Sequence, residues 1–290
     1  MAEIIDGKAT SLQIQDELAL EVSEIKKNGG KTPHLAAILV GDDGASVTYV
    51  NAKVKACERI GFGSTLVHLP ASTTEKELLL KVEELNNNPE IDGFIVQVPL
   101  PSHIDEQKVV DAIDPKKDVD GFHPVNMGKM VLGLPGMVPA TPKGIMLLLE
   151  KNGIETEGKH VVVMGRSHTV GTPVSVLLSR KSKPGNSTVT QVHSRTKDIP
   201  SITRLADILV VAIGQPEFVT AEMVKKEAVV IDVGIHRVTD ETRKSGFRLV
   251  GDVKFEEVSK IASKITPVPG GVGPMTIAAL LYNTLLATKY

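Results

Sequence analysis

The feature that most constrains the fold is a repeated alternation of short apolar runs with segments of helical periodicity. The first three runs of strand length are LAAILV (35–40), STLVHL (64–69) and GFIVQV (93–98). They alternate with helical segments near residues 46–60, 74–86 and 105–113. An amphipathic helix with Thr10 as its expected N-cap precedes them. Strands that alternate with helices predict a parallel α/β layer.

The same rhythm restarts after Pro142, where two prolines interrupt the periodicity. A helix to about residue 151 precedes further apolar runs, HVVVM, STVTQV, DILVVAI and VVIDV. The sequence therefore predicts an α/β protein of two domains with mainly parallel sheets. We expect a first domain of residues 1–141, completed by a C-terminal helix at 274–290, and a second domain of residues 142–273.

Charge and cysteine content exclude several classes of function. The chain has 33 basic and 35 acidic residues and no basic block, so nucleic acid is not an expected partner. The single cysteine, Cys57, excludes an intrachain disulfide and any metal site of several cysteines. No secretory signal precedes the first helix, and the apolar stretch 277–286 is too short to span a bilayer. We expect a cytoplasmic protein without a membrane partner.

The stretch GRSHTVGTP (165–173) follows the run HVVVM directly, as a dinucleotide-binding turn does. A turn between a strand and a helix presents free N–H groups and the positive helix end to a pyrophosphate. Gly165 permits the turn, Ser167 replaces the usual middle glycine, and Gly171 comes one residue late. Because the match is degenerate, a simple connection between strand and helix remains an alternative.

The end of the next strand indicates which dinucleotide is bound. NAD sites place a carboxylate there for the ribose 2′-hydroxyl, whereas this chain reads His193-Ser194-Arg195-Thr196. Ser194 and Arg195, with Arg166 in the turn, are donors suited to the 2′-phosphate of NADP. A solvated Arg195 is the alternative, but three donors at these two turns favour NADP over NAD.

Tyr49 and Lys53 are four residues apart, so on a helix they share a face. A tyrosine beside a lysine can serve as an acid–base pair if burial shifts their pKa values. Short-chain dehydrogenases use this spacing, but there it follows the cofactor turn, and here it precedes the turn by about a hundred residues. By spacing alone, an ordinary amphipathic helix with Lys53 in solvent is the better interpretation.

Three further features are unusual in polarity or backbone chemistry. Gln97 interrupts an apolar strand where its carboxyl end should emerge, at the edge where α/β sheets bind ligands. DPKKDVDGFHP (114–124) carries three aspartates that could cap or turn the chain. PVPGGVGPMT (267–276) precedes a helix whose first residue we expect to be Pro274, and could bring bare backbone against a flat ligand.

Taken in order, four motifs resemble the bifunctional methylenetetrahydrofolate dehydrogenase/cyclohydrolase family over essentially the whole chain. The motifs are ASVTYVNAK, DGFIVQVPLP with KDVDGFHP, GRSHTVGTP and PVPGGVGPMT. The resemblance implies a folate domain closed by the C-terminal helix, a Rossmann-like NADP domain and a cleft between the two. It also implies a homodimer formed through the second domain.

The resemblance assigns roles residue by residue. Lys53 would be the catalytic acid–base group, positioned by Gln97, with Tyr49 lining the site and Asp120 holding the pterin. The implied folate contacts are Tyr49, Lys53, Val96, Gln97, Val98, Asp120, Pro269, Gly270, Gly271, Val272, Gly273, Pro274, Met275, Thr276 and Ile277. The implied NADP contacts are Gly165, Arg166, Ser167, Ser194, Arg195 and Ile235.

The implied chemistry is oxidation of methylenetetrahydrofolate with NADP and hydrolysis of the methenyl product to formyltetrahydrofolate, without a metal. Two other functions compete: a shikimate-type NADP dehydrogenase of similar architecture, and an NADP-sensing module without turnover. Ala140, Val192 and His236 stand where relatives commonly have cysteine, cysteine and asparagine. None of these departures removes an assigned catalytic group.

Overall fold

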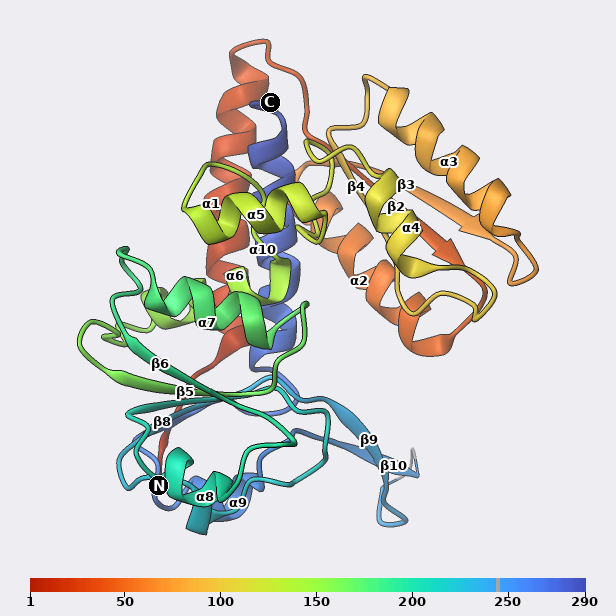
Figure 1. Cartoon of the computed structure of the whole chain (residues 1–290). Helices are drawn as coiled ribbons and strands as arrows, with labels where there is room; N and C mark the ends of the chain where they lie inside the picture. The colour runs from red at the N-terminus through yellow and green to blue at the C-terminus, as the bar shows by residue number, and fades with distance from the viewer. Residues whose placement is uncertain (244–245) are drawn as a thin grey trace. The chain divides into compact units, whose positions relative to one another are not determined.

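Two sheets of parallel strands organise the chain in the computed structural model, which describes residues 1–243 and 246–290 (Figure 1). Residues 12–140 and 277–290 form one unit, here called the three-stranded unit. Residues 1–11 and 141–276 form the other, here called the six-stranded unit. The predicted α/β class with mainly parallel sheets is confirmed.

The three-stranded unit has the strand order β3-β2-β4, with every pair parallel. Its strands are β2 (His34–Val40), β3 (Gly63–Leu69) and β4 (Gly93–Val96). The connecting helices are α2 (Gly44–Ile60), α3 (Glu75–Asn87) and α4 (Glu106–Ala112). α3 and α4 lie side by side, and α2 packs on β2 and β3 (Figure 1). Each predicted strand and connecting helix of this unit is found, with its ends within two residues of the expected bounds; β4 ends at Val96, two residues before the end of the run GFIVQV.

Both faces of β2, the central strand of this sheet, are buried. Ala36, Ile38 and Val40 enter one apolar cluster with residues of α3 and α4, such as Leu78 and Val109. The intervening residues of β2 are also buried, at 3% exposure each. Both faces of a parallel strand need cover, and an unbroken apolar run supplies it.

Further helical segments complete this unit. They are α5 (Pro124–Leu132), residues 12–27 of α1 (Gly7–Lys27) and residues 277–287 of α10 (Val272–Ala287). Asn283 of α10 is fully buried and donates through Nδ2 to the carbonyls of Val119 and Val138, at 2.8 Å each. This amide ties the KDVDGFHP motif, through Val119, to the segment before α6, through Val138.

The six-stranded unit has the order β1-β11-β8-β7-β5-β6, and all five pairings are parallel. Its strands are β1 (Glu3–Ile4), β11 (Lys264–Ile265), β8 (Val229–Asp232), β7 (Ile208–Val211), β5 (His160–Met164) and β6 (Thr188–Val192). The helical segments are α6 (Ala140–Lys151), α7 (Gly171–Ser179), α8 (Ile199–Thr203), η1 (Ala221–Met223) and α9 (Phe255–Val258). α7 packs on β5 and β6. A separate antiparallel pair joins β9 (His236–Thr239) to β10 (Phe247–Val250).

Three expectations about chain ends differ from the structure. Residues 1–11 belong to the six-stranded unit because β1 pairs with β11. Thr10 is not the N-cap of the first helix, which begins at Gly7 and is capped by Asp6, whose Oδ1 accepts from Ala9 N at 2.9 Å. The last helix begins at Val272, so Pro274 lies inside its first turn. Within residues 1–243 and 246–290, no helix is long and apolar enough to cross a membrane.

Gly121 gives a direct test of the packing around the KDVDGFHP motif. Its φ is +78°, and an added Cβ would lie 2.6 Å from backbone atoms of Val138 and Pro139. We expect Gly121→Ala to lower the free energy of unfolding by about 2 kcal/mol or more, because backbone atoms must move. Urea unfolding followed by circular dichroism measures this. Gly44→Ala is the control, since nothing lies within 4 Å of its Cβ position, and should change stability by less than about 0.5 kcal/mol.

Candidate active site and cofactor site

α2 places Lys53 on its buried side. Asp43 caps the helix by accepting from Ser46 N at 2.8 Å, and Gly61 ends it in the left-handed conformation. The buried stripe of the helix consists of Ser46, Val50, Lys53, Ala56, Cys57 and Ile60. Lys53 is only 8% exposed. The interpretation of an ordinary helix with Lys53 in solvent is therefore wrong.

Gln97 lies directly after β4 and meets Lys53. Its backbone N–H still donates to Ile38 O at 2.8 Å, so the sheet fixes its position. Its Nε2 donates to Val98 O at 2.6 Å, which turns the amide oxygen the other way. That oxygen accepts from Lys53 Nζ at 3.1 Å. Lys53 and Gln97, 44 residues apart in the chain, are thus brought together.

The three aspartates of DPKKDVDGFHP have different tasks. Asp118 is buried and accepts from the backbone N–H groups of Gly121, Phe122 and His123, which folds the turn. Asp114 makes a local turn by accepting from Lys116 N at 2.9 Å. Among the described residues, no backbone N–H group donates a hydrogen bond to the Asp120 carboxylate.

Asp120 acts electrostatically on Lys53. Burial lowers the pKa of Lys53, and the nearby Asp120 carboxylate partly opposes that shift. Burial likewise raises the pKa of Asp120, while Lys53 pulls it down and Asp118 pushes it up. Burial also raises the pKa of Tyr49, one helical turn before Lys53. A lysine whose pKa is lowered releases its proton more readily than an exposed lysine, which suits it to proton transfer.

Cys57 lies on the same stripe of α2 but has no comparable chemistry. It is fully buried, and desolvation raises the pKa of its thiol to about 12. A thiol in that state is neither a nucleophile nor a metal ligand at neutral pH. Across residues 1–243 and 246–290, no group of three or more His, Cys, Asp or Glu side chains is arranged to hold a metal.

In the six-stranded unit the turn between β5 and α7 is tightly built. Gly165 has φ +115°, and an added Cβ would lie 2.1 Å from Ala212 O. A Cβ on Gly171 would lie 2.3 Å from Gly165 O. Ser167 Oγ accepts from Val170 N and Gly171 N at 3.1 and 3.3 Å, which leaves its own proton to donate. The two glycines and this serine form a cradle suited to a phosphate.

A cavity of about 270 Å³ opens beside this turn, at the carboxyl ends of the strands. It is lined by Met164, Gly165, Arg166, Ser167, Val192, His193, Ser194, Ile199, Ala212, Ile213, Gln215 and Phe218. Four of the six expected cofactor residues therefore lie on one cavity. Arg195 is exposed beside Ser194 without lining it, and Ile235, 46% exposed, does not line it either.

Several residues that line this cavity or hold its turn were not expected from the sequence. Gln191 of β6 donates from Nε2 to Gly165 O at 3.0 Å and so holds the turn in place. The sequence did carry a signal for Gln191, because it is a polar residue near the carboxyl end of β6. Gln97 has a similar place, directly after β4. Gln215 and Phe218 follow β7 in a loop that carries no motif of its own.

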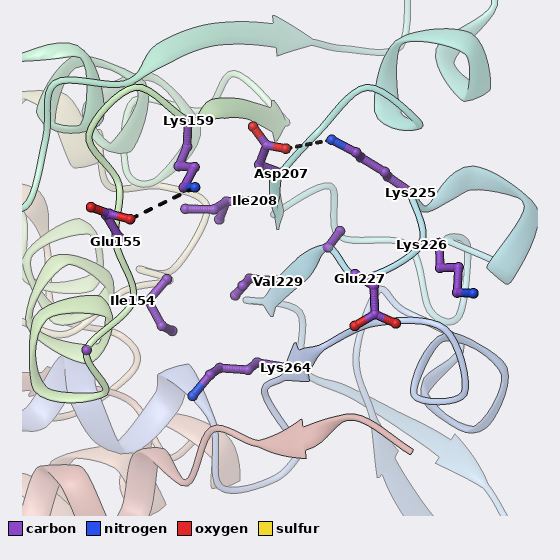
Figure 2. A pocket seen from close by; sticks show the side chains of 12 residues that line it. Ile154, Glu155, Lys159, Asp207, Ile208, Lys225, Lys226, Glu227, Val229 and Lys264 are labelled. Carbon is purple, nitrogen blue, oxygen red and sulfur yellow. Dashed lines mark hydrogen bonds and ion pairs between the residues drawn. The ribbon is translucent and has the colours of Figure 1, made fainter.

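A larger concavity of about 360 Å³ lies at the amino ends of strands of the same sheet (Figure 2). Its lining includes Ile208, Val229 and Lys264, the first residues of β7, β8 and β11. Two ion pairs lie within its lining: Lys225 contacts Asp207 at 2.6 Å and Lys159 contacts Glu155 at 4.0 Å (Figure 2). Because α/β sheets bind ligands at the carboxyl ends of their strands, the smaller cavity is the better cofactor site.

The PVPGGVGPMT segment is fixed within the six-stranded unit by the first turn of α1. Gly270 has φ +106°, and its carbonyl accepts from Lys8 N at 2.9 Å. A Cβ on Gly7 would lie 1.8 Å from Gly271 O, so two glycines meet there. Ser11 Oγ donates to Pro274 O at 2.8 Å. The segment from Pro269 to Thr276 is thereby held with bare backbone, while Ile277 belongs to the three-stranded unit.

The three departures from the usual motifs all have structural tasks. Ala140 is buried, and its N–H donates to Asp120 O at 3.1 Å. Val192 is buried and lines the smaller cavity. His236 Nε2 donates to Asp252 Oδ1 at 2.7 Å. None of them takes the place of a residue of the Lys53 cluster.

Comparison with known proteins decides the family. The family described as tetrahydrofolate dehydrogenase/cyclohydrolase matches through its catalytic domain at residues 5–120 and its NAD(P)-binding domain at residues 139–290. The chain belongs to this family. A relative named Bifunctional protein FolD from Cytophaga hutchinsonii is 67% identical over 98% of both chains.

Solved structures agree with this membership. The methylenetetrahydrofolate dehydrogenase-cyclohydrolase of Trypanosoma brucei, complexed with NADP and an inhibitor, is 43% identical with a TM-score of 0.92, covering 99% of this chain and 97% of that one. A shikimate dehydrogenase from Aquifex aeolicus is 15% identical with a TM-score of 0.51, covering 88% of this chain and 91% of that one. The second likeness is one of fold alone.

The electrostatic coupling of Lys53 to Asp120 can be measured directly. Asp120→Asn removes the negative charge that raises the pKa of Lys53, so this pKa should fall further below its ordinary value. NMR titration of labelled lysine side chains measures it. Asp111→Asn, which removes an exposed carboxylate from α4 in the same unit, should leave the Lys53 titration unchanged. Equal titration curves for wild type and Asp120→Asn would contradict the coupling.

Proposed function

We propose that Lys53, Gln97 and Asp120 are the reaction centre for folate chemistry in this family member. The chain is a bifunctional enzyme that oxidises 5,10-methylenetetrahydrofolate with NADP and hydrolyses the methenyl product to 10-formyltetrahydrofolate. The observation that carries the assignment of the centre is a buried lysine hydrogen-bonded to a glutamine and electrostatically coupled to a carboxylate. A helix built only for packing would not bury such a group.

Each of these residues has a distinct part. Lys53 moves protons, and Gln97 holds its Nζ in one place through the 3.1 Å hydrogen bond. Asp120 accepts from the N–H donors of the pterin's amino-pyrimidine edge, for which two adjacent carboxylate oxygens are suited. Tyr49 packs against the aromatic part of the folate. Val96, Val98 and the segment from Pro269 to Ile277 supply further folate contacts.

Protonation of Lys53 links the two reactions. When bound, NADP supplies the hydride acceptor for the methylene carbon. As an ammonium ion, Lys53 disfavours the neighbouring methenyl cation and so promotes its hydration. As a neutral amine, it takes a proton from the attacking water. Burial lowers the pKa of Lys53, which makes the neutral amine more accessible than it is in an exposed lysine.

The smaller cavity of the six-stranded unit fits the NADP cofactor by its chemistry. We assign Gly165, Arg166 and Ser167 to the pyrophosphate, because glycines allow close approach and the serine proton is available. Ser194 and Arg195 supply donors for the 2′-phosphate, and no carboxylate stands there to bind a free 2′-hydroxyl. Ile235 contacts the cofactor through its exposed side chain.

The two competing functions lack this support. A shikimate-type dehydrogenase shares the architecture but not the PVPGGVGPMT segment or the Lys53, Gln97 and Asp120 set. A module that only senses NADP has no need of a buried, desolvated lysine in a separate unit. Family membership and the chemistry of this cluster favour turnover over sensing.

We also propose that the protein is a cytoplasmic homodimer formed through the six-stranded unit. The β9–β10 ribbon supports this, because each of its strands pairs only with the other among the described residues. Two-stranded ribbons with open edges are readily extended by a second chain. The single buried Cys57 suits a reducing compartment.

Replacement of Lys53 tests the reaction centre. Lys53→Met keeps the length of the side chain and removes its proton chemistry, so hydrolysis of methenyltetrahydrofolate should fall by roughly a hundredfold or more. NADP should bind with unchanged affinity, since the cofactor cavity lies in the other unit. Lys55→Met, on an exposed position of the same helix, is the control. An unchanged hydrolysis rate in Lys53→Met would remove Lys53 from this role.

Replacement of Arg195 tests the cofactor preference. Arg195→Ala should raise the KM for NADP by about tenfold and that for NAD much less, because a charge-assisted hydrogen bond to the 2′-phosphate is lost. Steady-state rates with each cofactor measure the ratio. Lys197→Ala removes a neighbouring exposed cation and should affect both constants little. Equal effects of Arg195→Ala on the two cofactors would refute the assignment.

A further inference from the structure

The loop that follows β7 is held by a single carboxylate. The backbone N–H groups of Ile213 and Gly214 donate to Asp252 Oδ2 at 2.7 and 3.0 Å, and that of Gln215 donates to Oδ1 at 2.9 Å. Three successive N–H groups converging on one anion form a nest of the kind that commonly binds a phosphate. Here the nest is filled from inside the protein.

The same loop lines the cofactor cavity. Ala212, Ile213, Gln215 and Phe218 contribute to its wall. Because the N–H groups at 213–215 are taken by Asp252, they are not available to the cofactor phosphates. The β5–α7 turn must supply the backbone donors, and the 213–215 loop instead gives the cavity its shape.

Asp252 is itself fixed by a second carboxylate. Its side chain is completely buried, and its N–H and that of Val253 donate to Asp232 at 3.0 Å each. Asp232 ends β8 and also accepts from Gly234 N at 3.0 Å, while its own N–H donates to Thr266 Oγ1. Burial raises the pKa of Asp232 to about 7, and its three N–H donors act against that shift.

Two glycines make room for this pair of carboxylates. A Cβ on Gly251 would lie 1.8 Å from Asp232 Oδ2, and a Cβ on Gly234 would lie 2.5 Å from Asp252 Cγ. His236, at the start of β9, donates from Nε2 to Asp252 Oδ1 at 2.7 Å. The carboxylate of Asp252 therefore ties the 213–215 loop to the segment that carries Ile235.

We propose that Asp252 is a positioning residue for NADP, which it serves by holding the 213–215 loop and the Ile235 segment in the shape that the cofactor cavity requires. His236 and Asp232 assist by fixing the Asp252 side chain and backbone. Asp252 acts through these segments, and its carboxylate is saturated by four donors of the protein itself. The proposal rests on the assignment of the smaller cavity to NADP.

The decisive variant is Asp252→Asn, which keeps the size of the side chain but offers one acceptor oxygen in place of two. We expect the Kd for NADP to rise at least about tenfold, because one of the two oxygens that hold the loop is replaced by an NH2 donor, which cannot accept from the N–H groups. The KM for NADP should rise in parallel, with the KM for methylenetetrahydrofolate unchanged. Asp207→Asn is the matched control. Asp207 accepts from His160 N and pairs with Lys225 at the other end of the sheet. The Kd of this variant for NADP should stay within about twofold of wild type.

Circular dichroism shows whether Asp252→Asn folds. If it does not, variants of His236 provide a second test of the proposal. His236→Ala should raise the Kd for NADP by roughly threefold through the loss of one donor, and His236→Asn, which retains a donor, should restore it. Isothermal titration of NADP into each variant measures these constants. A folded Asp252→Asn variant, or His236→Ala, with wild-type affinity would overturn the positioning role. Failure of the wild type to bind NADP would overturn the cofactor assignment, and with it this proposal.

Discussion

The burial of Lys53 is the constraint on which the proposed folate chemistry depends. A charged side chain that is 8% exposed on an otherwise apolar helical stripe is costly unless it is paired or becomes neutral. In the three-stranded unit the Gln97 amide oxygen lies 3.1 Å from Lys53 Nζ, and the Asp120 carboxylate is close enough to raise the pKa of Lys53. Strand β4, the Asp118 turn and Asn283 serve to hold those two partners in place.

In the six-stranded unit, backbone segments approach one another closely at the carboxyl ends of the strands. Gly165, Gly171, Gly234 and Gly251 each lie where a Cβ would clash within 2.5 Å. Buried carboxylates then organise the loops that these glycines bring together. The result is a cavity whose shape comes from internal hydrogen bonds. Arg166, Ser194 and Arg195, which we propose as cofactor contacts, are exposed in or beside it.

The sequence predicted the layers well because apolar runs directly report buried parallel strands, and five-residue β5 agrees with the run HVVVM residue for residue. It could not predict that Lys53 is buried, because helical spacing does not say which face of α2 packs on the sheet. Nor could it separate Asp118 from Asp120, which share one motif and differ only in their partners. The Asp232 and Asp252 pair lay beyond prediction, since it joins the end of β8 to a segment 20 residues later, and neither carries a motif.

Turnover of methylenetetrahydrofolate with each nicotinamide cofactor tests the central claim most directly. The purified protein would be mixed with this substrate and NADP, or NAD, while the absorbance of the reduced cofactor and of the methenyl product is followed. We expect rapid reduction of NADP, much slower reduction of NAD, and subsequent loss of the methenyl signal as the formyl product appears. Absence of turnover with both cofactors would contradict the folate enzyme assigned to this chain.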